Sequence, residues 1–183
     1  MTQTRDIRRH TFLPFLALTL IVEGTLTITG NPLKTDTAPL GIISYELAGS
    51  VEKAQMILES WSEPVKRLAA FNLGLDFLFI FAYTITISLA CSWAGAVFKN
   101  RFSPFAQLSQ PLVWGLLLAG SLDVTENLAL FLMLMDRATQ PWPGIAAWAA
   151  IIKFTLVALG LFYTFIGGLT WIFTQSPNLR RSS

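Results

Sequence analysis

The chain has 183 residues, of which 53% are hydrophobic and 13% are charged, and its formal net charge is +2. A soluble domain carries about 25% charged residues, so this chain has about half the charge needed to cover a surface that faces water. The composition therefore argues against an ordinary soluble domain and predicts a protein whose solvent is lipid.

Four apolar runs are long enough to cross a hydrocarbon core, which takes about 20 residues. They cover residues 12–30, 68–98, 111–135 and 144–173. They are too long and too uninterrupted for barrel strands of about 10 residues, so each is expected to be a helix. The first run contains Glu23 and four threonines and is not followed by a signal-peptide cleavage site, so it is interpreted as a retained helix. We expect one all-α membrane domain over residues 1–183.

Basic residues are unevenly distributed between the two sides of this predicted bundle. One side has seven Lys and Arg against the single acid Asp6, and these seven are Arg5, Arg8, Arg9, Lys99, Arg101, Arg180 and Arg181. The other side has five basic residues and six acids, the acids being Asp36, Glu46, Glu52, Glu59, Glu63 and Asp136. The positive-inside rule places the first side, with both termini, in the cytoplasm of a cell (inner or plasma) membrane protein. The formal charge of +2 is thus explained by topology and gives no reason to expect nucleic acid as a partner.

The links between the four predicted helices indicate how these helices are arranged. The links 99–110 and 136–143 are short, so the helices that they join are expected to be antiparallel neighbours in a four-helix bundle. The outer segment 31–67 is longer, and Ser50 is expected to cap an amphipathic helix over residues 51–61. That helix is interpreted either as a lid that only stabilises the bundle or as a gate.

Ionisable side chains inside the predicted helices are the most informative feature of the sequence. Each costs about 2.5 to 3.5 kcal/mol on insertion scales, so each requires a partner or a function. At about 1.5 Å per residue, all of them fall in the middle or outer half of the hydrocarbon core. They are Glu23, Asp76, Asp123, Glu126 and Lys153.

Helical spacing gives each of the four helices one polar stripe, and we expect all four stripes to face the interior. The resulting layer has four carboxylates and one ammonium, a formal charge of −3, so protons, water or a bound cation or amine must neutralise it. The predicted ligand-binding or ion-binding residues are Glu23, Asn72, Asp76, Asp123, Glu126, Asn127 and Lys153. The alternative is that the pairs only hold helices together.

Recognised catalytic and cofactor motifs are missing from the sequence. The only histidine is His10, which excludes bis-histidine haem ligation within one chain, and the only cysteine is Cys91. No metal ligand set is predicted, and the sequence does not identify a cofactor.

Three segments of the chain resemble those of uncharacterised small four-helix membrane proteins of bacteria. They are 45–50 (YELAGS), 73–79 (LGLDFLF) and 122–128 (LDVTENL), within a similarity that spans about residues 40–130. This resemblance implies the four-helix architecture and brings no activity. A looser similarity, to the sterol-isomerase and sigma-2-receptor group, implies amine or lipid binding by acids on membrane helices. No histidine stands beside the acids of this chain, and no catalytic residue is transferred.

Two functions of different classes fit these observations. The first is a membrane protein whose acidic layer binds or passes a cation, a proton or an amphipathic amine or lipid ligand. The second is a structural or accessory subunit of a larger membrane complex, without ligand chemistry of its own. An enzyme that acts on a lipid is a third reading and ranks below both. The sequence names neither the ligand nor the partner, which could be another protein or a second copy of the chain.

Overall fold

The computed structural model describes residues 2–99 and 103–175. Within these residues every regular element is a helix. The four long ones are α1 (Thr2–Gly30), α4 (Glu63–Phe98), α6 (Ser109–Leu132) and α7 (Trp142–Gln175). The short ones are η1 (Asn31–Leu33), α2 (Ile42–Glu46), α3 (Val51–Ser60), α5 (Ser103–Gln107) and η2 (Met133–Arg137), of which η2 is π-helical. The four long helices are long and apolar enough to cross a membrane, so the predicted all-helical class with four such helices is confirmed.

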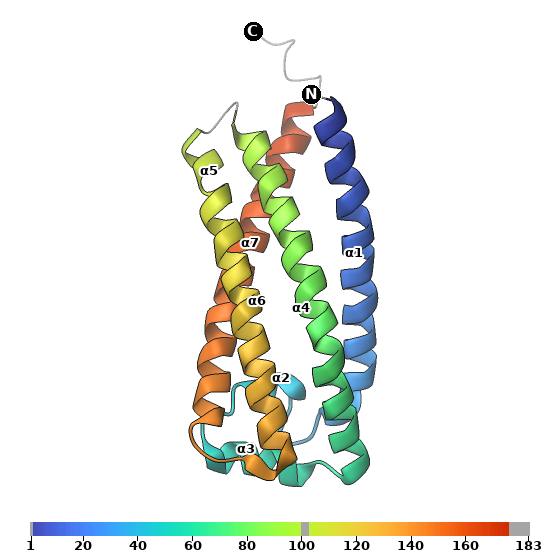
Figure 1. The fold of residues 1–183 in the computed structure, drawn as a ribbon, viewed down its shortest axis with the longest axis vertical. Coiled ribbons are helices and arrows are strands. Elements are labelled where there is room, and N and C mark those ends of the chain that lie inside the picture. Colours follow the sequence, from blue (N-terminus) through green and yellow to red (C-terminus); the bar gives the residue numbers. More distant parts are fainter. Residues whose placement is uncertain (1, 100–102, 176–183) are drawn as a thin grey trace.

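The long helices run alternately up and down (Figure 1). The start of α1, the end of α4, the short helix α5 and the end of α7 lie at one end of the bundle, and α2, α3 and the connection between α6 and α7 lie at the other. The helix α4 begins five residues before the apolar run that predicted it. Its first turn holds Glu63 and Pro64, which suit a helix start and which hydropathy does not detect.

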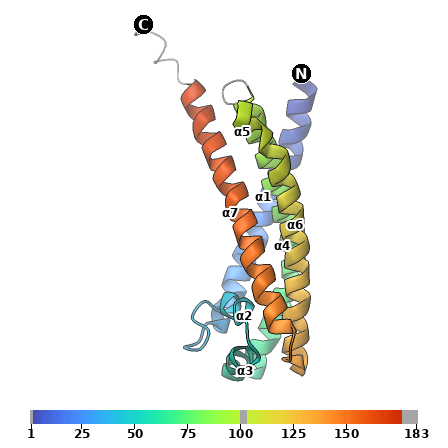
Figure 2. The ribbon, with the colours of Figure 1, turned by 90° about the vertical axis from the view of Figure 1, so that its left-hand side faces the viewer.

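The helices α4, α6 and α7 pack closely against one another (Figure 2). Two glycines of α7 permit this approach. A Cβ atom on Gly167 would lie 2.5 Å from the Cβ of Ala94, and one on Gly160 would lie 3.2 Å from Ile87 and from Leu116. The side of α7 that has these glycines is therefore the side that packs on α4 and α6.

By contrast, α1 is peripheral and packs mainly along α4. Hydroxyl and amide groups join the two helices: Thr19 Oγ1 lies 3.0 Å from Thr86 Oγ1, and Thr29 donates a hydrogen bond to Asn72 Oδ1 at 3.1 Å. In the apolar part of its span 6% of residues are buried, compared with 39%, 50% and 33% in the spans that contain α4, α6 and α7. Most of the α1 surface is thus left without a partner in this chain.

Residues 31–62, called here the lid segment, close the end of the bundle opposite the start of α1. As predicted, Ser50 caps α3 by accepting a hydrogen bond from the Lys53 amide at 3.3 Å. The predicted apolar face of α3 is turned toward the bundle, because Ala54, Ile57 and Trp61 are buried. The amphipathic helix is therefore confirmed as an element that packs over the bundle.

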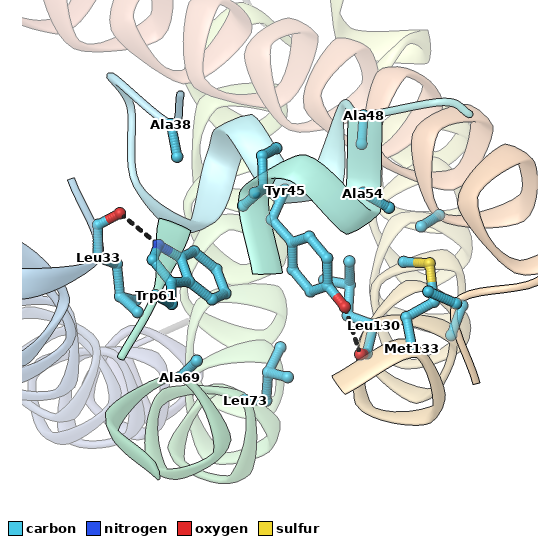
Figure 3. Close-up of a cluster of buried hydrophobic side chains, with 14 residues drawn as sticks. Leu33, Ala38, Tyr45, Ala48, Ala54, Trp61, Ala69, Leu73, Leu130 and Met133 are labelled. Carbon is cyan, nitrogen blue, oxygen red and sulfur yellow. Dashed lines mark hydrogen bonds between the residues drawn. The ribbon is translucent and has the colours of Figure 1, made fainter. Parts of the chain in front are cut away.

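Two buried aromatic side chains anchor the lid segment (Figure 3). The Trp61 indole donates a hydrogen bond to the Leu33 carbonyl at 2.9 Å, and the Tyr45 hydroxyl donates one to the Leu130 carbonyl of α6 at 3.3 Å. Tyr45 comes from α2, a five-residue helix that the sequence analysis did not predict. Gly41 and Gly49 flank α2 with positive φ angles of 63° and 69°, a conformation that other residues adopt at a cost.

Candidate functional site

Lys153 is the centre of a buried group of acidic side chains. Its ammonium donates hydrogen bonds to Asp123 Oδ1 at 2.6 Å and to Glu126 Oε1 at 2.8 Å. Both acids belong to α6, where their spacing of three residues puts them on one face, and Lys153 reaches them from α7. Glu126 is completely buried, and the exposed fractions of Asp123 and Lys153 are 4% and 6%. Such short charge-assisted bonds in a buried site join α6 to α7 directly.

A third carboxylate reaches Lys153 from the lid segment. Glu46 Oε2 lies 3.9 Å from Lys153 Nζ, and the residue is 8% exposed. The sequence analysis counted Glu46 among the charges of the outer side and did not include it in the site, whereas in the structure it is a buried member of the site. Because α2 is anchored at Tyr45, the next residue turns into the bundle. The one available signal was the apolar setting of Glu46, which ends the run from Ile42 to Tyr45 and precedes Leu47.

Neutral donors hold the acids in place. The Tyr83 hydroxyl of α4 donates a hydrogen bond to Asp123 Oδ2 at 2.9 Å, so both oxygens of that carboxylate have partners. Asn127 of α6, which directly follows Glu126, donates a hydrogen bond from Nδ2 to Asp76 Oδ2 of α4 at 2.6 Å. The acid–lysine cluster, defined here as Glu46, Asp76, Asp123, Glu126 and Lys153, thus draws on α2, α4, α6 and α7.

The predicted residues fall into two sets. Five of the seven come together, and they are Asp76, Asp123, Glu126, Asn127 and Lys153. Asn72 is buried one turn from Asp76, but its side chain bonds to Thr29 and to the Leu68 carbonyl. Glu23 stands apart on the exposed side of α1, where it accepts a hydrogen bond from Thr27 at 3.4 Å.

The expectation that the first helix turns its whole polar stripe inward is therefore wrong. Thr19 does face α4, but Glu23 and Thr27 are exposed. Residues four apart on a helix are rotated by about 40° relative to each other, so the stripe drifts round α1 and leaves its contact with α4.

The charge of the cluster is unbalanced. Four carboxyl groups against one ammonium give a formal charge of −4 + 1 = −3, the value expected earlier, although Glu46 takes the place of Glu23. Two buried carboxyl oxygens, Glu46 Oε2 and Glu126 Oε2, accept no hydrogen bond from the described residues. Burial raises the pKa of Glu46 above its ordinary value, the Lys153 ammonium opposes this rise, and the Asp123 carboxylate adds to it.

The geometry limits what the cluster can hold. The Lys153 ammonium already occupies the position between the acids that a small cation or amine would take. Among the described residues, no group of three or more His, Cys, Asp or Glu side chains has an arrangement suited to a metal ion. Two surface hollows lie elsewhere, beside Lys53 on the lid segment and beside Lys99 at the other end of the bundle, and none of their lining residues belongs to the cluster. The carboxyl oxygens of Glu46 and Glu126 that accept no hydrogen bond remain able to hold protons.

Comparison with protein-family models, with curated proteins and with solved structures finds no match. The class of the protein therefore comes from its own fold and site. It is a helical bundle with four helices long and apolar enough to span a membrane, and it has a buried acid–lysine cluster beneath its lid segment.

Proposed function

We propose that this chain is a multi-pass membrane protein with both termini in the cytoplasm, and that its acid–lysine cluster binds protons from the outer side. The observation that carries the proposal is the contact of one buried ammonium with three carboxyl groups. Two of these groups, Glu46 and Glu126, have a buried oxygen that accepts no hydrogen bond from the described residues. A buried charge without a partner is far less stable than a neutral group. An excess of carboxyls over ammonium groups is thus neutralised by protons.

Protons are favoured over a metal ion or an amine because the Lys153 ammonium already fills the space between the carboxylates of Asp123 and Glu126. Lys153 Nζ lies 2.6 and 2.8 Å from its two carboxylate partners, which leaves no position for a second cation between them. A proton needs no added volume, because it binds to a carboxyl oxygen that is already in the site. Of the ligands that the sequence analysis considered, namely a cation, a proton or an amphipathic amine or lipid, the proton fits the cluster best.

Glu46 is the expected route of exchange with the outer solution. It is the one acid of the cluster that comes from the lid segment and not from a long helix. Its neighbours in the site are Lys153 of α7 and the two acids of α6, so a proton on Glu46 is adjacent to all three. The turns at Gly41 and Gly49 bound the segment that would move if the lid opens. The gating interpretation of the lid therefore becomes part of the proposal.

Infrared spectroscopy tests proton binding directly, through the carbonyl stretch of protonated carboxyl groups. Wild-type protein in lipid vesicles of uniform orientation should show this band at about pH 7. The band should weaken when the pH facing the lid segment is raised. Glu46→Gln and Glu126→Gln should each remove part of the band, whereas Glu59→Gln, at an exposed position on α3, should leave it unchanged.

Two outcomes would overturn the proposal. If the band is absent near neutral pH, the carboxyl groups are ionised and the cluster stores no proton. If the band is present but responds to the pH on neither side of the membrane, the protons are a fixed part of the packing and the cluster only holds the helices together.

An accessory role in a larger membrane complex is the second candidate, and one observation favours it. The helix α1 packs mainly along α4, so most of its apolar span is not buried by the described residues, and this span has an exposed carboxylate. A surface of this kind fits a protein that works beside a partner. Proton binding and complex formation are compatible, because they use different parts of the molecule.

A further inference from the structure

The exposed face of α1 has a carboxylate at mid-span that the acid–lysine cluster does not use. Glu23 lies near the middle of the apolar span His10–Leu33 and is about 10 Å from the end of α1 at Gly30, by helical rise. Its side chain is too short to reach either end of the span. Its neighbours on the helix surface are Leu20, which lies three residues before it and is 62% exposed, and Thr27, which lies four residues after it and is also exposed.

This position contrasts with that of the three acids within the other predicted apolar runs. Asp76, Asp123 and Glu126 each have a polar partner on another helix or turn inward to Lys153. The Glu23 carboxylate has a weak contact of 3.4 Å with Thr27 on its own helix. A carboxylate in contact with hydrocarbon costs about 2.5 to 3.5 kcal/mol, and a cationic partner on another helix would offset that cost.

The shape of the same face suits a second helix. Exposed or half-buried residues follow one another at alternating spacings of four and three, which is the pattern of a left-handed helix pair. They are Leu13, Ala17, Leu20, Gly24 and Thr27 of α1 and Asn31 at the start of η1. Ala17 and Gly24 make two shallow positions in this row. A Cβ atom on Gly24 would meet nothing within 4 Å, so the space beside it is open in the isolated chain. Small residues let a neighbouring helix approach closely.

We propose that this face of α1 is the docking surface for a transmembrane helix of another protein, and that this partner helix has a Lys or Arg at the depth of Glu23. The carboxylate supplies the charge complementarity, and the row from Leu13 to Asn31 supplies the apolar contact. A second copy of the chain fits less well, because a parallel pair of α1 helices would put two Glu23 carboxylates at the same depth without a cation between them. The docking surface is independent of the acid–lysine cluster.

The experiment uses the full chain in lipid vesicles and measures energy transfer to labelled synthetic helices of Leu and Ala. One peptide has a Lys at its centre, and the matched peptide has Leu there. The Lys peptide should bind wild-type protein about tenfold more tightly than the Leu peptide, and Glu23→Gln should abolish this difference. Gly24→Leu should weaken binding of both peptides. It should not lower the Tm, because its site is open in the isolated chain and leucine favours a helix more than glycine does.

A control places the acid elsewhere. In the double variant Glu23→Gln with Ser121→Glu, the carboxylate moves to an exposed position on α6. Binding should not be restored, because Leu122 follows the new carboxylate on α6, whereas Gly24, which leaves open space beside the helix, follows Glu23 on α1. Equal binding of the two peptides to wild-type protein, or full recovery in the double variant, would overturn the proposal. Disulfide cross-linking of Ala17→Cys chains to each other that the Lys peptide does not displace would assign the surface to a second copy instead, and would also overturn it.

Discussion

Glu46 of α2 lies 3.9 Å from Lys153 of α7, measured from Oε2 to Nζ, and this contact joins the lid segment to the core of the bundle. Every other carboxylate partner of Lys153 in the described part of the chain belongs to α6. The lid segment thus contributes more than apolar cover, because one of its side chains belongs to the charged site. Any change in the protonation of the cluster also changes the force that holds the lid segment down.

The first prediction concerns topology. In a Cys91→Ser background, a cysteine in place of Lys34 should react with an impermeant thiol reagent from outside the cell, and one in place of Lys99 only from the cytoplasm. Both positions are exposed and lie at opposite ends of the bundle. The positive-inside rule also predicts that a cysteine in place of Arg137 is accessible from outside and that one in place of Arg181 is accessible from inside. The Arg181 position lies outside the described residues. Reversed accessibility of Lys34 and Lys99 would exclude the proposed orientation.

Much of the fold followed from the sequence because four long apolar runs have few alternatives to membrane-length helices. Most of the site followed as well, since Asp123, Glu126 and Asn127 form one stripe and Lys153 is the only cation within the apolar runs. The position of Glu46 did not follow. A five-residue helix is too short for periodicity to show which side faces inward, and its burial depends on the distant contact between Tyr45 and α6.

Glu23 shows a second limit of sequence reasoning. Its place on a polar stripe with Thr19 was read correctly, but periodicity does not determine which side of a peripheral helix meets the bundle. The helix α1 packs mainly on α4, so only a narrow strip of its surface is covered. Thr19 lies within that strip and Glu23 lies outside it.

The second prediction concerns the pH dependence that Glu46 imparts. Burial raises its pKa in the folded protein, so between the ordinary and the raised pKa the folded state binds more protons than the unfolded state. The free energy of unfolding must then fall as the pH rises through this window. Glu46→Gln should match wild type in Tm at about pH 4 and should be the more stable of the two at about pH 8. Thermal melting in detergent measures the difference.

The matched control is Glu59→Gln, which removes an exposed carboxyl from the same lid segment. Its Tm should differ from that of wild type by the same small amount at every pH. If Glu46→Gln behaved in the same way as this control, Glu46 would not change its protonation on folding, and its assignment to the cluster would fail.

The third prediction concerns the sharing of Lys153 between two acids. Asp123→Asn should weaken the pairing only partly, because Glu126 keeps its bond of 2.8 Å and Asn can still accept a hydrogen bond from Tyr83. Glu126→Gln should likewise be tolerated. The double variant should lose more stability than the sum of the two, with a coupling of about 0.5 to 3 kcal/mol. Additive losses would show that the two carboxylates act on Lys153 independently.

The last prediction concerns Lys153 itself, because it is the cation on which the acids converge. Lys153→Met leaves Asp123, Glu126 and Glu46 without their ammonium, and breaking a buried pair in this way costs about 3 to 5 kcal/mol. The acids can reduce that cost by taking up protons, since a neutral buried carboxyl is less costly than an unpaired charge. Lys153→Met should therefore be destabilised most at about pH 8 and approach wild type at about pH 5.

Lys53→Met, at an exposed position on α3, is the control and should show a difference from wild type that is small at every pH. A loss of stability in Lys153→Met that stays constant across this range would mean that Lys153 is not coupled electrostatically to the acids, and the charged cluster would then have no central residue.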